Sequence, residues 1–165
     1  MARTAKRWSA RKTRWMLNLF PPFSLQGIRV RSVGPDFRSC TVAVRRSLLS
    51  RNLHGSTFGG TLFAAADPIY PVLLWQSLLR RNLEVEAWLE SASIEYAAPA
   101  RGTVLMHFEI ESTLLDAAEQ ALLATNRFSH SFNIRGVDEQ GTLCVAIESK
   151  VYLRRRGKRP GRSSK

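Results

Sequence analysis

A chain of 165 residues with 44% hydrophobic residues is long enough to form one domain with a sizeable core, and too apolar to be disordered. The formal net charge is +12, but most of this charge lies at the two ends of the chain. Residues 1–14 carry six Lys or Arg and residues 154–165 carry seven, with no acidic residue in either segment. The stretch between them is nearly neutral, so the net charge alone does not indicate a nucleic-acid-binding domain.

The first expected element is a basic, aromatic segment at residues 3–19. Two tryptophans, a methionine and a leucine recur there at roughly helical spacing among Arg and Lys. We interpret the segment as a short helix packed on the domain with a basic start. Pro21-Pro22 ends it, because proline cannot continue a helix. A membrane-surface helix and an organelle presequence in residues 1–20 are the alternatives to this interpretation. We otherwise expect a cytoplasmic protein.

Six short runs alternate between apolar and polar residues, which is the period of half-buried β-strands. A small helix from Leu114 to Thr125 separates the fourth run from the fifth. Cys40 and Cys144 fall in these runs and are expected as reduced core thiols, not as a disulfide. Strands this close together in a chain are joined most easily as antiparallel neighbours. The six runs lie at residues 28–31, 40–45, 85–96, 104–111, 128–134 and 143–153.

The longest apolar stretch runs from Asn52 to Leu79, and Asp67 is its only formally charged residue. Its composition predicts a buried helix with Ser56 or Thr57 as N-cap. Prolines directly after Asp67 predict a kink or a restart there. Because a charged residue, two prolines and a glutamine interrupt the stretch, we expect no transmembrane span. The sequence therefore predicts an α+β domain in which an antiparallel sheet wraps around a long central helix.

A glycine pair and a carboxylate on this helix suggest chemistry at a carbonyl group. Gly59-Gly60 lies where the helix is expected to begin, and helix N-termini offer free N–H groups that stabilise a developing oxyanion. Apolar surroundings are expected to raise the pKa of Asp67, which suits a general base. The alternative role of Asp67 is structural, as the N-cap of a helix segment restarting at Pro68.

Gly60 and Asp67 are seven residues apart. On a regular helix they share a face but lie about 10 Å apart along the axis. An oxyanion donor and a general base must each come within about 3 Å of the reacting centre. One subunit cannot provide both, so we predict a two-fold homodimer in which each subunit lends Asp67 to the Gly60 of the other. A dimer of dimers is the larger alternative.

The run from Asn52 to Asp67, NLHGSTFGGTLFAAAD, resembles the signature of hotdog-fold acyl-CoA thioesterases of the phenylacetate-pathway type. Ile94 to Pro99 with Gly102, and the closing strand from Val145 to Leu153, fit the same resemblance. The opening run from Arg14 to Pro22, RWMLNLFPP, is more similar to a hotdog subfamily whose members mostly lack an assigned function. The resemblance predicts a hotdog domain at residues 14–153 between basic tails at residues 1–13 and 154–165.

The resemblance implies a thioesterase-like hydrolase that acts on an acyl-CoA or another acyl thioester, with no cofactor beyond the coenzyme A of the substrate. Asp67 matches the nucleophile or general base of these enzymes. Gly60 matches the glycine whose N–H polarises the thioester carbonyl, and Asn52 matches a residue that orients water or substrate. The resembling families also form homodimers. The other residues of the run that we expect to contact the substrate are His54, Phe58, Gly59 and Phe63.

Phe58 departs from the family pattern, because the thioesterases usually carry His at this position. His54, four residues earlier, is a candidate replacement. The departure favours, as an alternative function, a non-catalytic module that binds an acyl chain or a lipid. A second alternative is weak binding of nucleic acid or an anionic membrane by the basic tails. His107 and His130 are far from any second pair of ligand-type residues, so we expect no metal site.

Overall fold

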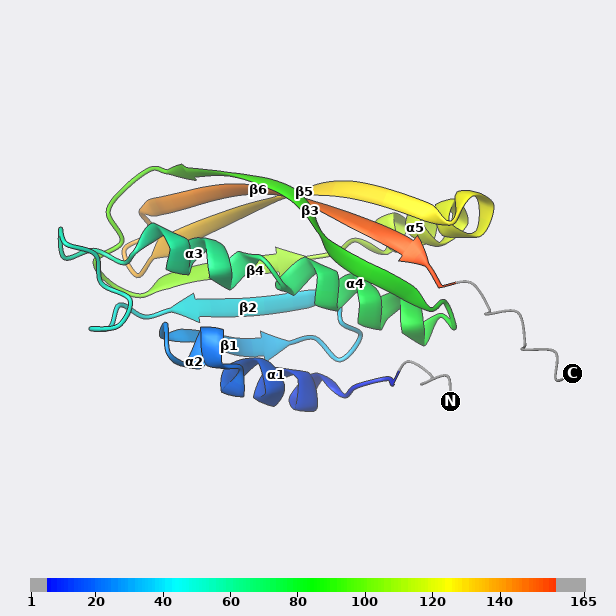
Figure 1. The fold of residues 1–165 in the computed structure, drawn as a ribbon, viewed down its shortest axis with the longest axis horizontal. Helices are drawn as coiled ribbons and strands as arrows, with labels where there is room; N and C mark the ends of the chain where they lie inside the picture. Colours follow the sequence, from blue (N-terminus) through cyan, green and yellow to red (C-terminus); the bar gives the residue numbers. More distant parts are fainter. Residues whose placement is uncertain (1–5, 157–165) are drawn as a thin grey trace, which may run out of the picture.

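The computed structural model describes residues 6–156, which form a six-stranded antiparallel sheet curled around a central pair of helices (Figure 1). The strand order across the sheet is β1-β2-β4-β5-β6-β3. The strands are β1 (Ile28–Val33), β2 (Ser39–Val44), β3 (Val85–Tyr96), β4 (Val104–Glu109), β5 (Arg127–Asp138) and β6 (Leu143–Arg155). The helices are α1 (Ala10–Leu19), α2 (Pro21–Ser24), α3 (Gly59–Ala66), α4 (Ile69–Arg80) and α5 (Ser112–Thr125). The predicted α+β architecture is confirmed.

The core lies between the central helices and the concave face of the sheet. Leu73, Leu74 and Leu78 of α4 are at most 1% exposed. In β4, buried and exposed side chains alternate as the sequence pattern predicts. Both cysteines, Cys40 and Cys144, are buried and free, as expected, and burial raises the pKa of the Cys40 thiol to about 12.

The start of α3 differs from the prediction. The N-cap is Phe58, which has no side-chain cap hydrogen bond, so the prediction of Ser56 or Thr57 as N-cap was wrong. The physical reason is a long-range backbone contact. The Thr57 N–H donates to the Ala100 carbonyl at 2.8 Å, which holds residue 57 in the preceding loop and delays the helix.

The central helix breaks where the sequence predicts a restart. α3 ends at Ala66 and α4 begins at Ile69, while Asp67 and Pro68 between them keep right-handed helical dihedrals. The combined stretch Gly59–Arg80 is long and apolar enough to cross a membrane by length and composition, but 67% of its most apolar window is buried inside the domain. An apolar helix that is mostly buried in this way is typical of the core of a globular domain.

The N-terminal segment is packed on the domain. The expected helix is present as α1, and its N-cap Ser9 accepts a hydrogen bond from the Lys12 N–H. Ahead of the helix, the Trp8 ring meets the Trp75 ring of α4 edge to face, with the centroids 4.9 Å apart. The domain boundary expected at residue 13 therefore falls inside α1. Residues 157–165 of the expected C-terminal tail lie outside the described residues.

Gln76, which interrupts the apolar run of α4, anchors this N-terminal segment. Its side chain is fully buried. The Gln76 Oε1 accepts the Trp8 N–H at 2.8 Å, and the Gln76 Nε2 donates to the Lys6 carbonyl at 3.3 Å. One polar side chain in the core thus fixes the chain before α1.

We expect Gln76→Leu to lower the free energy of unfolding by roughly 1–3 kcal/mol, because it leaves the partly buried Trp8 N–H and Lys6 carbonyl without partners. Urea denaturation of the full chain measures this. Gln120→Leu on the exposed side of α5 is the matched control and should change the free energy by no more than about 0.5 kcal/mol. Equal stability of the Gln76→Leu protein and the wild type would refute the anchoring role.

Candidate active site

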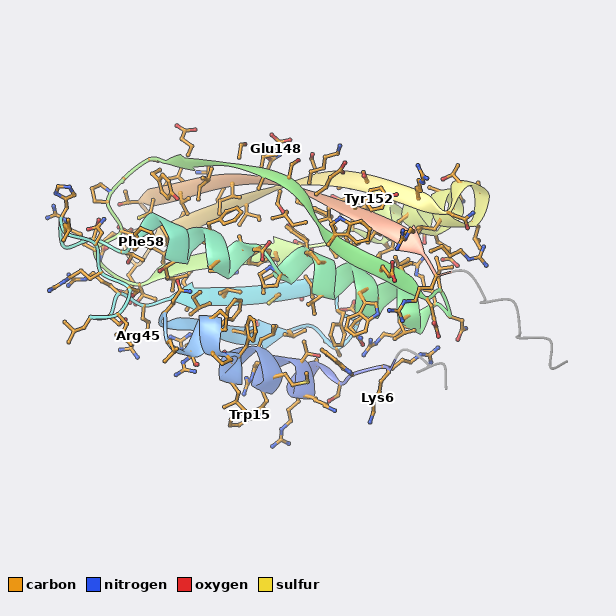
Figure 2. The ribbon with its side chains drawn as sticks, viewed as in Figure 1. Lys6, Trp15, Arg45, Phe58, Glu148 and Tyr152 are labelled. Atoms are coloured by element: carbon orange, nitrogen blue, oxygen red, sulfur yellow. The ribbon has the colours of Figure 1, made fainter. Side chains whose placement is uncertain are left out.

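A cleft of about 760 Å³ opens at the N-terminus of α3. Its walls are the loop before α3 and the segment that follows β3, residues 97–101. Five of the seven predicted site residues line it: Asn52, His54, Phe58, Gly59 and Gly60. Figure 2 labels Phe58 at the start of α3, beside the loop that precedes this helix. The lining also includes apolar side chains, among them Leu62, Ala97, Ala98 and Pro99.

The two glycines carry free backbone donors at the cleft floor. Gly59 and Gly60 occupy the first two positions of α3, where an N–H has no carbonyl partner within the helix. Within residues 6–156, neither N–H donates to a backbone carbonyl outside the helix. The positive end of the helix dipole adds to their attraction for a negatively polarised oxygen. This turn can therefore bind a carbonyl or carboxylate oxygen.

Aromatic rings lie close against both glycines. A Cβ at Gly60 would lie 2.5 Å from Cε1 of Phe58, and a Cβ at Gly59 would lie 2.6 Å from the hydroxyl oxygen of Tyr96. Only glycine allows this approach of ring to backbone. Phe58 is itself 57% exposed, so its ring can move without disturbing the core.

Asn52 organises the loop that forms one wall of the cleft. Its Oδ1 accepts the N–H groups of His54 at 3.0 Å and Ser56 at 3.1 Å, and its Nδ2 donates to the Ser56 hydroxyl at 2.9 Å. These bonds occupy the amide oxygen with the backbone of its own loop. Asn52 therefore positions His54, whose side chain is exposed at the cleft.

Asp67 and Phe63 lie outside this cleft. Asp67 follows α3 in the helical conformation and its side chain is exposed. Partial desolvation by the neighbouring residues raises the pKa of Asp67, as predicted. The capping alternative was wrong, because the N-cap of α4 is Pro68 and no side chain caps that helix. Gly60 and Asp67 thus remain on one continuous helical path, about two turns apart.

A family model described as "Domain of unknown function (DUF4442)" matches residues 9–153 of the chain. The chain belongs to this family. Among curated proteins, no significant match to the sequence was found.

Several solved structures are similar to this chain in fold. A protein of unknown function from Pseudomonas aeruginosa, named "Probable Thioesterase", has a TM-score of 0.79 at 16% identity, with 92% of this chain and 100% of that chain covered. A protein of unknown function from Chlorobaculum tepidum has a TM-score of 0.74 at 12% identity, with 91% and 99% covered. The E. coli PaaI protein of the phenylacetic acid degradation operon has a TM-score of 0.61 at 16% identity, with 89% and 92% covered. The predicted hotdog fold of thioesterase-like proteins is confirmed.

Two further residues, Thr57 and Tyr96, line the cleft, and the sequence analysis did not predict them as site residues. The Thr57 side chain is only 4% exposed and lines the cleft, and its hydroxyl has no hydrogen-bond partner within the described residues. Tyr96 closes over Gly59 from the end of β3. The run from Ile94 to Pro99 contained Tyr96 as part of the resemblance, but no local pattern linked it to a residue 37 positions earlier.

One face of the central helix in this DUF4442 chain is not covered by its own sheet. Residues at helical spacing along α3 and directly after it are partly exposed: Gly60, Ala64 and Asp67. The edge strand β3 is open as well, with exposed side chains from Glu90 to Ser93 on both of its faces. No group of three or more His, Cys, Asp or Glu within residues 6–156 is placed to hold a metal ion.

Proposed function

We propose that this protein is an acyl thioester hydrolase whose substrate is an acyl-CoA, and that its active site is completed by a second copy of the chain. The observation that carries this proposal is the pair of free N–H groups at Gly59 and Gly60 on the floor of a largely apolar cleft. Such a turn stabilises the oxyanion that forms when a thioester carbonyl is attacked. The name "Probable Thioesterase" of the similar Pseudomonas aeruginosa structure supports the same chemistry.

The general base in this proposal is Asp67 of the partner subunit. Within one chain, Asp67 lies about two helical turns from Gly60 and outside the cleft, so it cannot reach a carbonyl bound there. A two-fold dimer that pairs β3 with β3 of the partner would cover both the open strand edge and the uncovered helix face. Antiparallel helices across that axis bring Asp67 of the partner subunit toward Gly60.

The reaction follows from these positions. The thioester carbonyl oxygen accepts the Gly60 N–H, which makes its carbon more electrophilic. The ionised Asp67 of the partner subunit removes a proton from a water molecule, and the hydroxide adds to that carbon. The tetrahedral intermediate collapses with cleavage of the carbon–sulfur bond. The thiolate of coenzyme A then leaves and takes up a proton, and the carboxylic acid is released. No cofactor is needed beyond the coenzyme A that the substrate brings.

The test is hydrolysis of a panel of acyl-CoA esters of different chain length and of aromatic acyl groups, with release of free thiol as the readout. The apolar lining of the cleft predicts that at least one acyl-CoA is cleaved faster than its uncatalysed rate by the full chain. Absence of thiol release across the panel, in protein that is folded and dimeric, would refute hydrolysis of acyl-CoA.

A second candidate function is favoured by the Phe58 ring, which packs against Gly60 and lines the cleft. In a module that binds acyl chains without cleaving them, this ring would be part of an apolar floor. Saturable binding of a fluorescent fatty acyl probe, together with no thiol release from any acyl-CoA, would select this function over hydrolysis.

The pH dependence of hydrolysis should report Asp67. The base acts in its ionised form, and its pKa lies above the ordinary value of 3.8 because of desolvation. The rate should therefore fall as the pH is lowered through a midpoint above 3.8, and it should level off at higher pH. The pH profile of kcat/KM measures this midpoint. His54→Gln is the control and should show the same midpoint. If the midpoint disappears in this variant, the general base is His54 and not Asp67.

A further inference from the structure

The outer side of α1 and the residues on either side of α2 carry apolar side chains that the domain leaves uncovered. Trp15 is 54% exposed, Leu19 70%, Phe20 47% and Leu25 61%. Trp15 and Leu19 are one helical turn apart, so they lie along the same line of the helix. Figure 2 shows Trp15 pointing away from the sheet, on the side of α1 remote from the central helices. We call Trp15, Met16, Leu19, Phe20 and Leu25 the α1 outer face.

The domain fixes the orientation of this face. On the inner side of α1, Thr13 is 1% exposed and Leu17 packs against the core. Asn18 bonds the β1 backbone twice, because its Nδ2 donates to the Val30 carbonyl at 3.0 Å and its Oδ1 accepts the Val30 N–H at 2.8 Å. The helix therefore cannot turn its apolar outer side inward without breaking these bonds. The exposure of Trp15 and Leu19 is a fixed property of the fold.

Uncompensated positive charge surrounds the α1 outer face. No Asp or Glu occurs in the sequence before Asp36. The basic residues of α1 and β1 are all exposed, and within the described residues none of them forms an ion pair. Two of these side chains join the helix to the strand, since Arg14 donates to the Arg31 carbonyl and Arg29 donates to the Asn18 carbonyl, both at 3.1 Å. The basic residues concerned are Arg11, Lys12, Arg14, Arg29 and Arg31.

We propose that the α1 outer face binds the surface of a bilayer that contains anionic phospholipids. Tryptophan prefers the boundary between headgroups and acyl chains, Leu and Phe enter the upper acyl region, and Arg and Lys contact lipid phosphates. The positive charge around the α1 outer face favours an anionic bilayer as the binding partner. A second copy docked face to face would bring two sets of these cations together. The face borders β1, at the opposite edge of the sheet from β3, so it stays free in the dimer proposed above.

Flotation of the full chain with phosphatidylcholine vesicles, with and without phosphatidylglycerol, tests the proposal. We expect binding only to the vesicles that contain phosphatidylglycerol, and weaker binding as NaCl is raised. Trp15→Ser with Leu19→Ser should weaken it on the order of 10-fold per side chain, since each loses its apolar burial in the lipid. Arg11→Gln with Lys12→Gln should weaken it by about 5-fold per charge.

The control for these variants is Leu123→Ser, which removes a 53% exposed leucine on α5 and should float like the wild type. Residues 1–10 and 154–165 are unchanged in every variant. If Trp15→Ser with Leu19→Ser floats like the wild type, the basic tails alone account for binding and the proposal is overturned. No flotation of the wild type with either vesicle also overturns it, and so does dissociation of an oligomer by the same variant without any vesicle binding.

A second measurement places the face in the lipid. Leu19→Cys can be labelled with an environment-sensitive fluorophore, because the native Cys40 and Cys144 are buried and burial raises the pKa of both thiols. Phosphatidylglycerol vesicles should shift the emission of this label to the blue. The same label at Leu123→Cys should not respond. An equal response at both positions, or none at position 19, contradicts insertion of α1.

Discussion

Asp67→Asn is expected to lower kcat for acyl-CoA hydrolysis by about 1,000-fold, because the amide cannot accept the proton of the attacking water. The fold should survive, since the Asp67 side chain is exposed and caps no helix. The measurement is thiol release under saturating substrate, with circular dichroism and sedimentation to confirm a folded protein of wild-type assembly. Glu148→Gln, an exposed carboxylate on the outer side of β6, is the matched control and should keep full activity (Figure 2).

The same variant makes a prediction about stability whose sign is set by the pKa. A raised pKa means that the folded state disfavours the ionised carboxylate, so ionisation costs stability above the folded pKa. At neutral pH the Asp67→Asn protein should therefore unfold at the same urea concentration as the wild type or at a higher one. The difference should vanish when the pH falls below 3.8, where the carboxyl is protonated in both states. A folded Asp67→Asn protein with full hydrolase activity would rule out the catalytic role.

Two inactive variants are expected to restore activity when they share one dimer. Gly60→Pro removes the N–H donor at the second position of α3, where proline costs no intrahelical hydrogen bond, and the exposed Phe58 ring has to move aside for the proline side chain. In a heterodimer of Gly60→Pro and Asp67→Asn chains, one of the two composite sites has an intact donor and an intact base. Differently tagged chains, purified through both tags, should then show about half of the wild-type activity per dimer.

The reciprocal heterodimer distinguishes a shared site from one contained within a single chain. It pairs a wild-type chain with a chain that carries both substitutions. If each site combines Gly60 and Asp67 from different subunits, both of its sites lack one group and the dimer is inactive. If each chain uses its own Asp67, this heterodimer keeps about half of the activity and the first one keeps none. The two outcomes exclude each other.

The local patterns of the chain predicted much of the fold. The alternation in β4 and the apolar run of α3 and α4 could be predicted locally. The side of a strand or helix on which a residue lies is set by its spacing from its neighbours in the sequence. Asp67 and Pro68 predicted the helix break in the same way. The prediction of an N-cap at Ser56 or Thr57 failed, because the backbone bond from Thr57 to Ala100 comes from a segment more than 40 residues away.

The candidate site, like the fold, was predicted only in part from the sequence. From the sequence alone came the glycine turn at the start of a buried helix, the lone carboxylate two turns later, and the inference that the two cannot meet within one subunit. Only the tertiary structure decided that Tyr96 covers Gly59, that Asn52 uses its amide on its own loop, and that Trp15 faces outward beside an acid-free set of cations. The physical reason is that helical spacing is set by local backbone geometry, whereas ring-to-backbone packing and surface exposure depend on contacts between segments far apart in the chain.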